Sequence, residues 1–184
     1  MDRPLRRRSR WGAPLNQALM AELVKANRLV ANGQPGEAAP LYARLAQEME
    51  RSSHPRRAAN LHALAAHAYA DSADESNALA HARLALNLFI QYQVVERTPR
   101  FFANITRKMR NQGMAPAAEA LQKEFGDRVG PLPAGGPPAR QPQRGHLPPA
   151  CPQCGAPLRS DEVEWIDARS VECVYCGSVV RTEA

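Results

Sequence analysis

All four cysteines of the chain lie in one short segment and form two pairs with the same internal spacing. Cys151 and Cys154 make the first C-x-x-C pair, and Cys173 and Cys176 make the second after 18 intervening residues. Two cysteines three positions apart can direct their sulfur atoms at one metal ion if the backbone turns sharply between them. The spacing predicts a four-thiolate metal site with Zn²⁺ as the expected ion, and it leaves an iron site and two disulfides as alternatives.

Folding energetics and ligand type favour zinc in a structural role. A segment of about 35 residues cannot bury enough apolar surface to fold without a cross-link. Zinc binding contributes roughly 10–16 kcal/mol in small metal-dependent domains. Disulfides require an oxidising compartment, and the Arg-rich start of the chain lacks the apolar core of a secretion signal. Four sulfur ligands leave no open coordination position, so we expect no catalysis at the ion.

The residues around the cysteines resemble the zinc-ribbon family. Gly155 and Gly177 follow the two pairs, "EVEWIDARSVEC" lies between them, and "GSVVRT" follows the second. The resemblance implies a small antiparallel sheet with two metal-binding turns over residues 150–184. This segment has three arginines against six acidic residues. It is therefore expected to contact protein, because phosphate backbones are bound by cationic side chains.

The segment that must position this module is long and helical. Residues 14–128 are rich in Ala, Leu and Arg, and breaks rich in Gly, Pro, Ser and Asp interrupt them. The pattern predicts helices over 14–32, 36–51, 56–71, 75–96, 99–112 and 115–126.

The breaks recur with a period of 40 residues. Gly33, Ala73 and Gly113 are equally spaced, as is a set of alanines that includes Ala38. Such a period indicates stacked helix–turn–helix units. Through "GQPGEAAPLYARL", with Tyr42 at its end, the region resembles the tetratricopeptide-repeat family, although it lacks that family's early Trp and its period exceeds the usual 34 residues or so. The expected fold class is an all-α helical-hairpin array of about six helices plus a small β zinc ribbon.

The resemblance implies a concave groove lined by equivalent residues of the first helix in each pair. Its last end would be basic, because helix 99–112 carries several cations and no acid. We expect it to bind an acidic peptide, another protein, or the acidic ribbon of the same chain. The predicted partner-binding residues are Asn27, Asn60, His67, Arg100, Arg107 and Arg110.

The remaining segments predict organisation rather than chemistry. Residues 1–13 form a basic arm that is expected to be disordered, and residues 129–149 form a linker in which Pro and Gly fill 11 of 21 positions. No nucleotide-binding or metalloprotease motif occurs, so no enzymatic activity is expected. The chain reads as a cytoplasmic protein-interaction adaptor. The alternative is a nucleic-acid-associated factor that uses the arm and helix 99–112, consistent with the formal net charge of +6.

Overall fold

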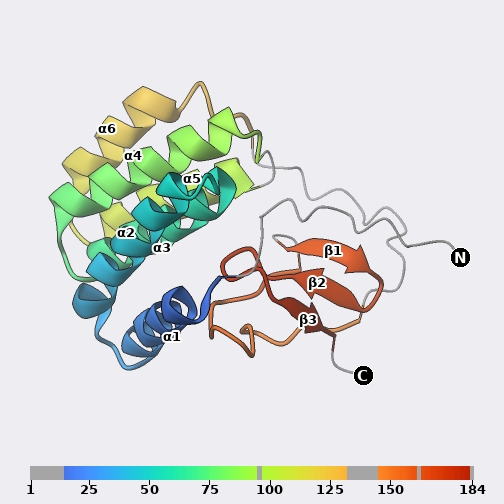
Figure 1. Cartoon of the computed structure of the whole chain (residues 1–184). Helices are drawn as coiled ribbons and strands as arrows, with labels where there is room; N and C mark the ends of the chain where they lie inside the picture. Colours follow the sequence, from blue (N-terminus) through green and yellow to red (C-terminus); the bar gives the residue numbers. More distant parts are fainter. Residues whose placement is uncertain (1–14, 95–96, 132–144, 161–162, 183–184) are drawn as a thin grey trace, which may run out of the picture.

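The main body of the protein is a set of six α-helices in the described part of the chain (Figure 1). The computed structural model describes residues 15–94, 97–131, 145–160 and 163–182. The helices are α1 (Gln17–Ala31), α2 (Pro35–Arg51), α3 (Pro55–Asp71), α4 (Glu75–Gln91), α5 (Arg97–Asn111) and α6 (Ala115–Phe125). Each helix packs on the next along the chain, and α3 also contacts α5 while α4 contacts α6. The predicted arrangement of paired helices is confirmed.

The five turns between these helices share one backbone conformation at intervals of 20 residues. Each contains one residue with a left-handed backbone, with φ between 52° and 79°: Gly33, Ser53, Ala73, Gln93 and Gly113. The amide of the following residue then donates to a carbonyl five positions back, at 2.8–2.9 Å. This Schellman pattern satisfies carbonyls that the helix end leaves without partners. Two such steps produce the 40-residue period of the sequence.

The fourth helix is shorter than its predicted range of 75–96. It ends at Gln91, where Tyr92 caps it and Gln93 takes a φ of 52°. The predicted break at Thr98 and Pro99 is also wrong, because both residues lie in the first turn of α5. Proline is tolerated there since the first amides of a helix have no partner within it.

The segment that carries the cysteines forms a small antiparallel sheet. Its strands are β1 (Glu164–Asp167), β2 (Ser170–Glu172) and β3 (Val179–Arg181), in the order β1-β2-β3. Val171 of β2 pairs with Trp165 and Val180, and Val171 and Val180 are buried. The predicted small sheet is confirmed. Residues 145–160 and 163–182 are called the cysteine module below.

Parts of the predicted arm and linker lie outside the described residues. The arm (1–13) does so entirely, and of the linker (129–149) only residues 129–131 and 145–149 are described. Val129 is buried beside α6, and its amide donates to the carbonyl of Phe125 at 3.0 Å. Gly145 donates to Ala168 at 3.2 Å, so it already belongs to the cysteine module.

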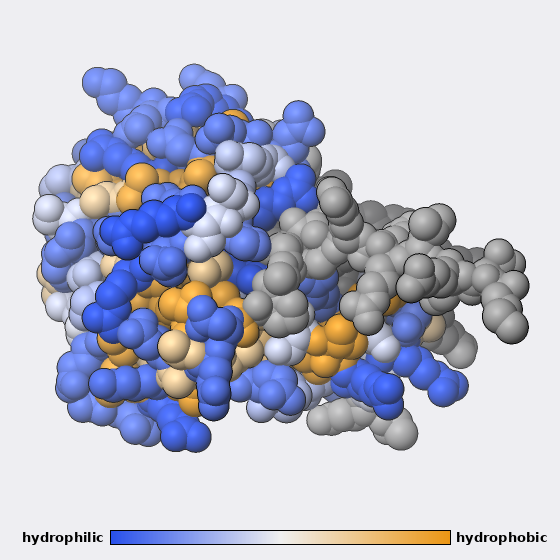
Figure 2. All heavy atoms as spheres, in the orientation of Figure 1, coloured by the Kyte–Doolittle hydropathy of each residue, from blue (hydrophilic) through white to orange (hydrophobic). Residues whose placement is uncertain are grey.

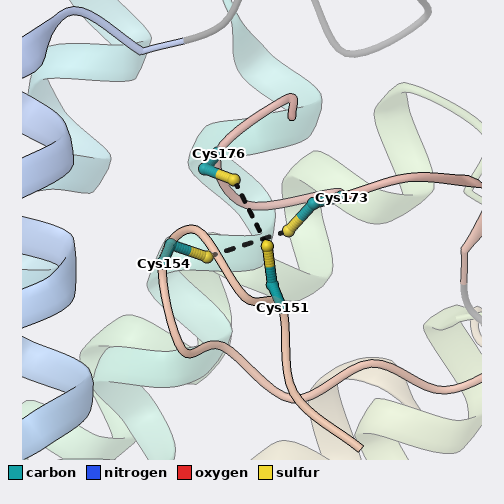
Figure 3. A group of neighbouring side chains, drawn as sticks. All are labelled: Cys151, Cys154, Cys173 and Cys176. Carbon is teal, nitrogen blue, oxygen red and sulfur yellow. Dashed lines mark hydrogen bonds between the residues drawn. The ribbon is translucent and has the colours of Figure 1, made fainter. Parts of the chain in front are cut away.

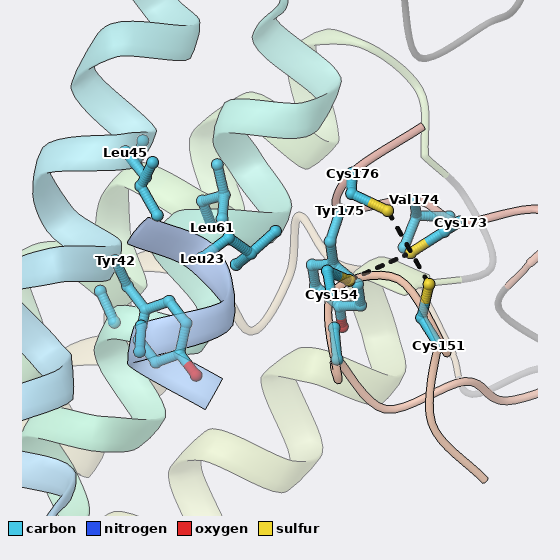
Figure 4. Close-up of a cluster of buried hydrophobic side chains, with 14 of the residues drawn as sticks. Leu23, Tyr42, Leu45, Leu61, Cys151, Cys154, Cys173, Val174, Tyr175 and Cys176 are labelled. Carbon is cyan, nitrogen blue, oxygen red and sulfur yellow. Dashed lines mark hydrogen bonds between the residues drawn. The ribbon is translucent and has the colours of Figure 1, made fainter. Parts of the chain in front are cut away.

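One hydrophobic core joins the helices to the cysteine module. It contains buried residues of α1–α3, such as Leu23, Tyr42 and Leu61, together with the four cysteines and Tyr175 (Figure 4). A second core lies between α3, α4, α5 and α6. The face in Figure 2 is mainly hydrophilic, with an apolar area over the helices and a smaller one over the sheet. Among the described helices, none has the length and apolar character needed to cross a membrane.

Candidate metal centre

Two tight turns bring the four cysteines together. In the first, the amide of Gly155 donates to the carbonyl of Cys151 at 2.7 Å, and in the second Gly177 donates to Cys173 at 2.8 Å. Both glycines have left-handed backbones, with φ of 76° and 78°. A side chain at either position would strain the turn, since this region of φ disfavours residues with a Cβ. These turns, termed the knuckles, aim both sulfurs of each pair in one direction.

The four sulfur atoms converge on a common centre (Figure 3). They all lie within 4.8 Å of one another, and the cysteines are buried. The Cys151 and Cys176 sulfurs are 3.8 Å apart, and those of Cys154 and Cys173 are 3.9 Å apart. A tetrahedron of sulfurs at about 2.3 Å from a zinc ion has edges of about 3.8 Å. The cluster therefore fits a single tetrahedral metal ion.

Such a cluster needs a cation to exist as four thiolates. Hydrogen bonding among the thiols moves their pKa values in opposite directions. The side-chain hydrogen bond with Cys151 raises the pKa of Cys154 and lowers that of Cys176. Protons would thus be shared among the sulfurs in the absence of a metal. A bound divalent ion replaces those protons, so metal binding is expected to weaken as pH falls.

Backbone carbonyls of the knuckles accept hydrogen bonds from the helical part. The Asn27 side-chain amide donates to Cys154 O at 2.6 Å, and that of Asn60 donates to Val174 O at 3.2 Å. The backbone amide of Leu15 donates to Cys176 O at 3.1 Å. Each of these carbonyls belongs to a metal-binding turn. The helices therefore recognise the shape that the knuckles adopt around the ion.

The Asn27 amide is itself fixed by a second hydrogen bond. Its side-chain oxygen accepts from the hydroxyl of Tyr42 at 2.7 Å, and Tyr42 is buried in α2. Gly155 packs against this asparagine so closely that an added Cβ would meet the Asn27 Cβ at 3.5 Å. The chain Tyr42–Asn27–Cys154 thus links two helices to the first knuckle.

Two arginines of the helical part are buried beside the cysteine module. Arg57 of α3 is 1% exposed, and Arg97 at the start of α5 is 9% exposed. Burial lowers the pKa of Arg57, whereas the nearby negative groups Glu172, Cys176 and Cys173 oppose this shift. Arg97 donates to the Tyr175 hydroxyl at 3.1 Å. Four thiolates around a divalent ion have a net charge of −2, which these guanidinium groups offset.

The residues predicted for the groove separate into three groups. Asn27 and Asn60 contact the knuckles, so the cysteine module covers that end. His67 and Arg107 line a cleft between α3, α5 and the module. Arg110 is exposed and lies outside the residues that line this cleft, as does the half-buried Arg100. Binding of a partner by any of the six stays a prediction.

Sequence reasoning missed the buried contacts of the module. Arg57 and Arg97 look like surface residues because isolated arginines usually are. Tyr42 was noted only as part of a repeat pattern. The available signal was the Ala-rich surroundings of Arg57, which predict a buried position on a helix. Nothing in the local sequence indicates that the module would occupy that position.

Known proteins provide no further guide to this site. Comparison of the chain with protein-family models, curated proteins and solved structures finds no match.

Proposed function

We propose that the protein is a zinc-binding adaptor for protein–protein interaction, built from a tetratricopeptide-like helical array and a structural zinc ribbon. The domain limits are those expected from the sequence, 14–128 for the array and 150–184 for the ribbon. No catalytic step forms part of the proposal. The partner would be another protein or an acidic peptide, bound on the basic surface of α5 with the ribbon as a second contact.

The observation that carries the proposal is the seating of the knuckles on the helices. Asn27 and Asn60 bind knuckle carbonyls, and a shared core continues behind them. A closed four-sulfur site has no coordination position for a substrate. The ion would therefore hold the module in the shape that the helices bind, which is a structural role in a scaffold.

The identity of the ion as zinc follows from ligand chemistry. Four thiolates in a tetrahedron suit zinc or iron, and zinc is the usual occupant of closed structural sites. Elemental analysis of the purified full-length chain should find one zinc ion per chain and little iron. A colourless preparation would agree with this, whereas a coloured protein with one iron per chain would replace zinc in the proposal.

The acidic nature of the partner is supported by the charge of α5. This helix carries Arg100, Arg107, Lys108 and Arg110 and contains no acidic residue. Lys108 is balanced by Asp71, with both carboxylate oxygens at 2.6 Å. Positive charge consequently predominates beside the cysteine module, where an acidic surface would be attracted.

The experiment compares protein and nucleic acid as partners. Purified full-length chain is used for affinity capture from native cells under cross-linking, in parallel with the Cys151→Ser/Cys154→Ser double variant. A saturable complex with a single acidic protein, re-formed from purified components and weakened in the double variant, supports the adaptor. Salt-sensitive shifts of nucleic acid that disappear when residues 1–10 are removed would instead favour the nucleic-acid alternative.

A further inference from the structure

A polar cleft of about 470 Å³ lies where α3, α5 and the cysteine module meet. Its lining includes Asn104, Arg107, Lys108 and Asn111 of α5, His67 of α3 and Arg159 of the module. This volume is within the range of small-ligand sites, about 300–1,000 Å³. The lining consists of hydrogen-bonding and cationic side chains instead of the apolar groups that typify most such sites. The cleft is therefore suited to a polar, negatively charged ligand.

The positive charge of the cleft comes from two opposed elements. Arg107 and Lys108 belong to α5, while Arg159 belongs to the loop between the first knuckle and β1. Asp71 balances Lys108, since both of its oxygens lie 2.6 Å from the ammonium nitrogen. Among the described residues at the cleft, three cations thus stand against one carboxylate. The excess of two positive charges matches a doubly charged anion.

The other lining groups supply hydrogen bonds without adding charge. Asn104 holds Arg107 in place by accepting from its guanidinium at 2.8 Å. Burial lowers the pKa of His67 to about 4, with the nearby Lys108 acting in the same direction. The imidazole is consequently neutral at pH 7. Its buried Nδ1 atom has no hydrogen-bond partner in the described part of the chain.

The geometry points to a binding site for a phosphoryl group, carried either by a segment of the proposed partner or by a small phosphorylated molecule. Guanidinium groups bind phosphate oxygens in pairs, and two arginines on separate walls can do so from different sides. A phosphate monoester has a charge of about −1.5 to −2 at pH 7, which balances the excess charge of the cleft. A single carboxylate, with one charge, would leave part of it unbalanced.

Completion of the cleft depends on the cysteine module. Arg159 follows Leu158, whose amide donates to Pro149 at 2.9 Å, and the carbonyl of Ala156 accepts from Cys151 at 2.8 Å. These bonds hold the Arg159 loop beside the first knuckle. The phosphoryl site thus has both walls only while the module is seated. The inference rests on the proposed function, because it places the anchor for the partner at this seam.

The test is a titration of the zinc-loaded, ¹⁵N-labelled full-length chain at constant ionic strength. The probes are inorganic phosphate, the peptide acetyl-Gly-phosphoSer-Gly-amide, its unphosphorylated form and hexaglutamate. Shifts of side-chain N–H signals report on Arg107 and Asn104 directly. The variants are Arg107→Gln and Arg159→Gln, with Arg110→Gln as the matched control on the same helix. Loss of one charged hydrogen-bond donor is expected to weaken binding about tenfold.

Saturable shifts with phosphate or the phosphopeptide, weakened about tenfold by Arg107→Gln and by Arg159→Gln but less than twofold by Arg110→Gln, would support the inference. Binding of only one of these two probes identifies the source of the phosphoryl group. Equal losses in Arg107→Gln and Arg110→Gln would show general attraction and overturn the site. Binding of hexaglutamate without either phosphate probe would also overturn it, while the adaptor proposal would stand. Failure of the adaptor would appear separately, in the capture experiment.

Discussion

The chemistry of single residues explains why a small module can be held against the helices without a large interface. Asn27 and Asn60 supply neutral amides to carbonyls that the knuckles expose. Arg57 supplies charge where an anionic metal centre is buried. Removing one member of a buried charged set is costly, about 3–5 kcal/mol, because the remaining charges lose their compensation.

Replacement of Arg57 should therefore weaken both folding and metal retention. Arg57→Met is expected to lower the free energy of unfolding by about 3 kcal/mol and to speed transfer of zinc to a coloured chelator. Arg56→Met is the matched control, since Arg56 is half-buried and donates to the Tyr92 carbonyl at 3.0 Å. Equal chelator kinetics in both variants would show that Arg57 does not compensate the metal centre.

A buried histidine pair predicts the acid sensitivity of the helices. The Nδ1 atoms of His62 and His81 are 2.9 Å apart, and Glu50 contacts His62 Nε2 at 3.1 Å. Burial, reinforced by His62, lowers the pKa of His81 to about 4, against the opposing charge of Asp74. Between pH 6.5 and 4 the unfolded chain binds more protons than the folded one, so stability falls as pH decreases in this window.

The variant His81→Phe keeps a stacked ring beside Tyr69 but removes this titration. Its free energy of unfolding should fall by about 2 kcal/mol less than that of the parent between pH 7 and pH 5. Urea unfolding at the two pH values measures the difference. The metal site contributes equally to both proteins, so the comparison isolates the imidazole. Identical losses would mean that His81 is not held neutral by the fold.

At the scale of elements, the recurring turn sets the stacking of the helices. Gly33 and Gly113 were visible in the sequence, whereas the equivalent Ser53 and Gln93 gave no local signal for a left-handed backbone. The 40-residue period was therefore found, and its 20-residue subdivision was not. The error at the end of α4 has the same origin, because Gln93 forms the turn that glycine marks elsewhere.

This turn permits a paired test of backbone strain. Ala73 has a φ of 61°, and Gly113 has a φ of 79° with no atom within 4 Å of an added Cβ. Left-handed backbone costs residues with a side chain about 1–2 kcal/mol. Ala73→Gly should therefore raise the midpoint of thermal unfolding, and Gly113→Ala should lower it, each by about 1 kcal/mol of stability. Changes of the same sign in both variants would contradict the shared turn.

At the scale of the whole molecule, the sequence predicted the parts better than their assembly. The paired helices and the small sheet follow from local patterns of Gly, Pro, Cys and apolar residues. The seat of the module does not, because a Pro- and Gly-rich linker permits many placements. It is decided by contacts between residues more than 70 positions apart, such as Asn60 with Val174 and Arg97 with Tyr175.

The assembly predicts that metal removal releases the module while the helices remain. Without the ion the knuckles lose their shape, and the carbonyls of Cys154 and Val174 no longer meet Asn27 and Asn60. After chelation at pH 7.5, far-ultraviolet circular dichroism should keep most of its helical signal, since α4–α6 have a separate core with part of α3. The radius of gyration from small-angle scattering should increase, and amide exchange should rise in the knuckles and α1. Restored zinc should reverse these changes, which separates release from aggregation. Unchanged scattering and continued protection of the knuckle amides in the metal-free chain would show that the helices hold the module without the ion.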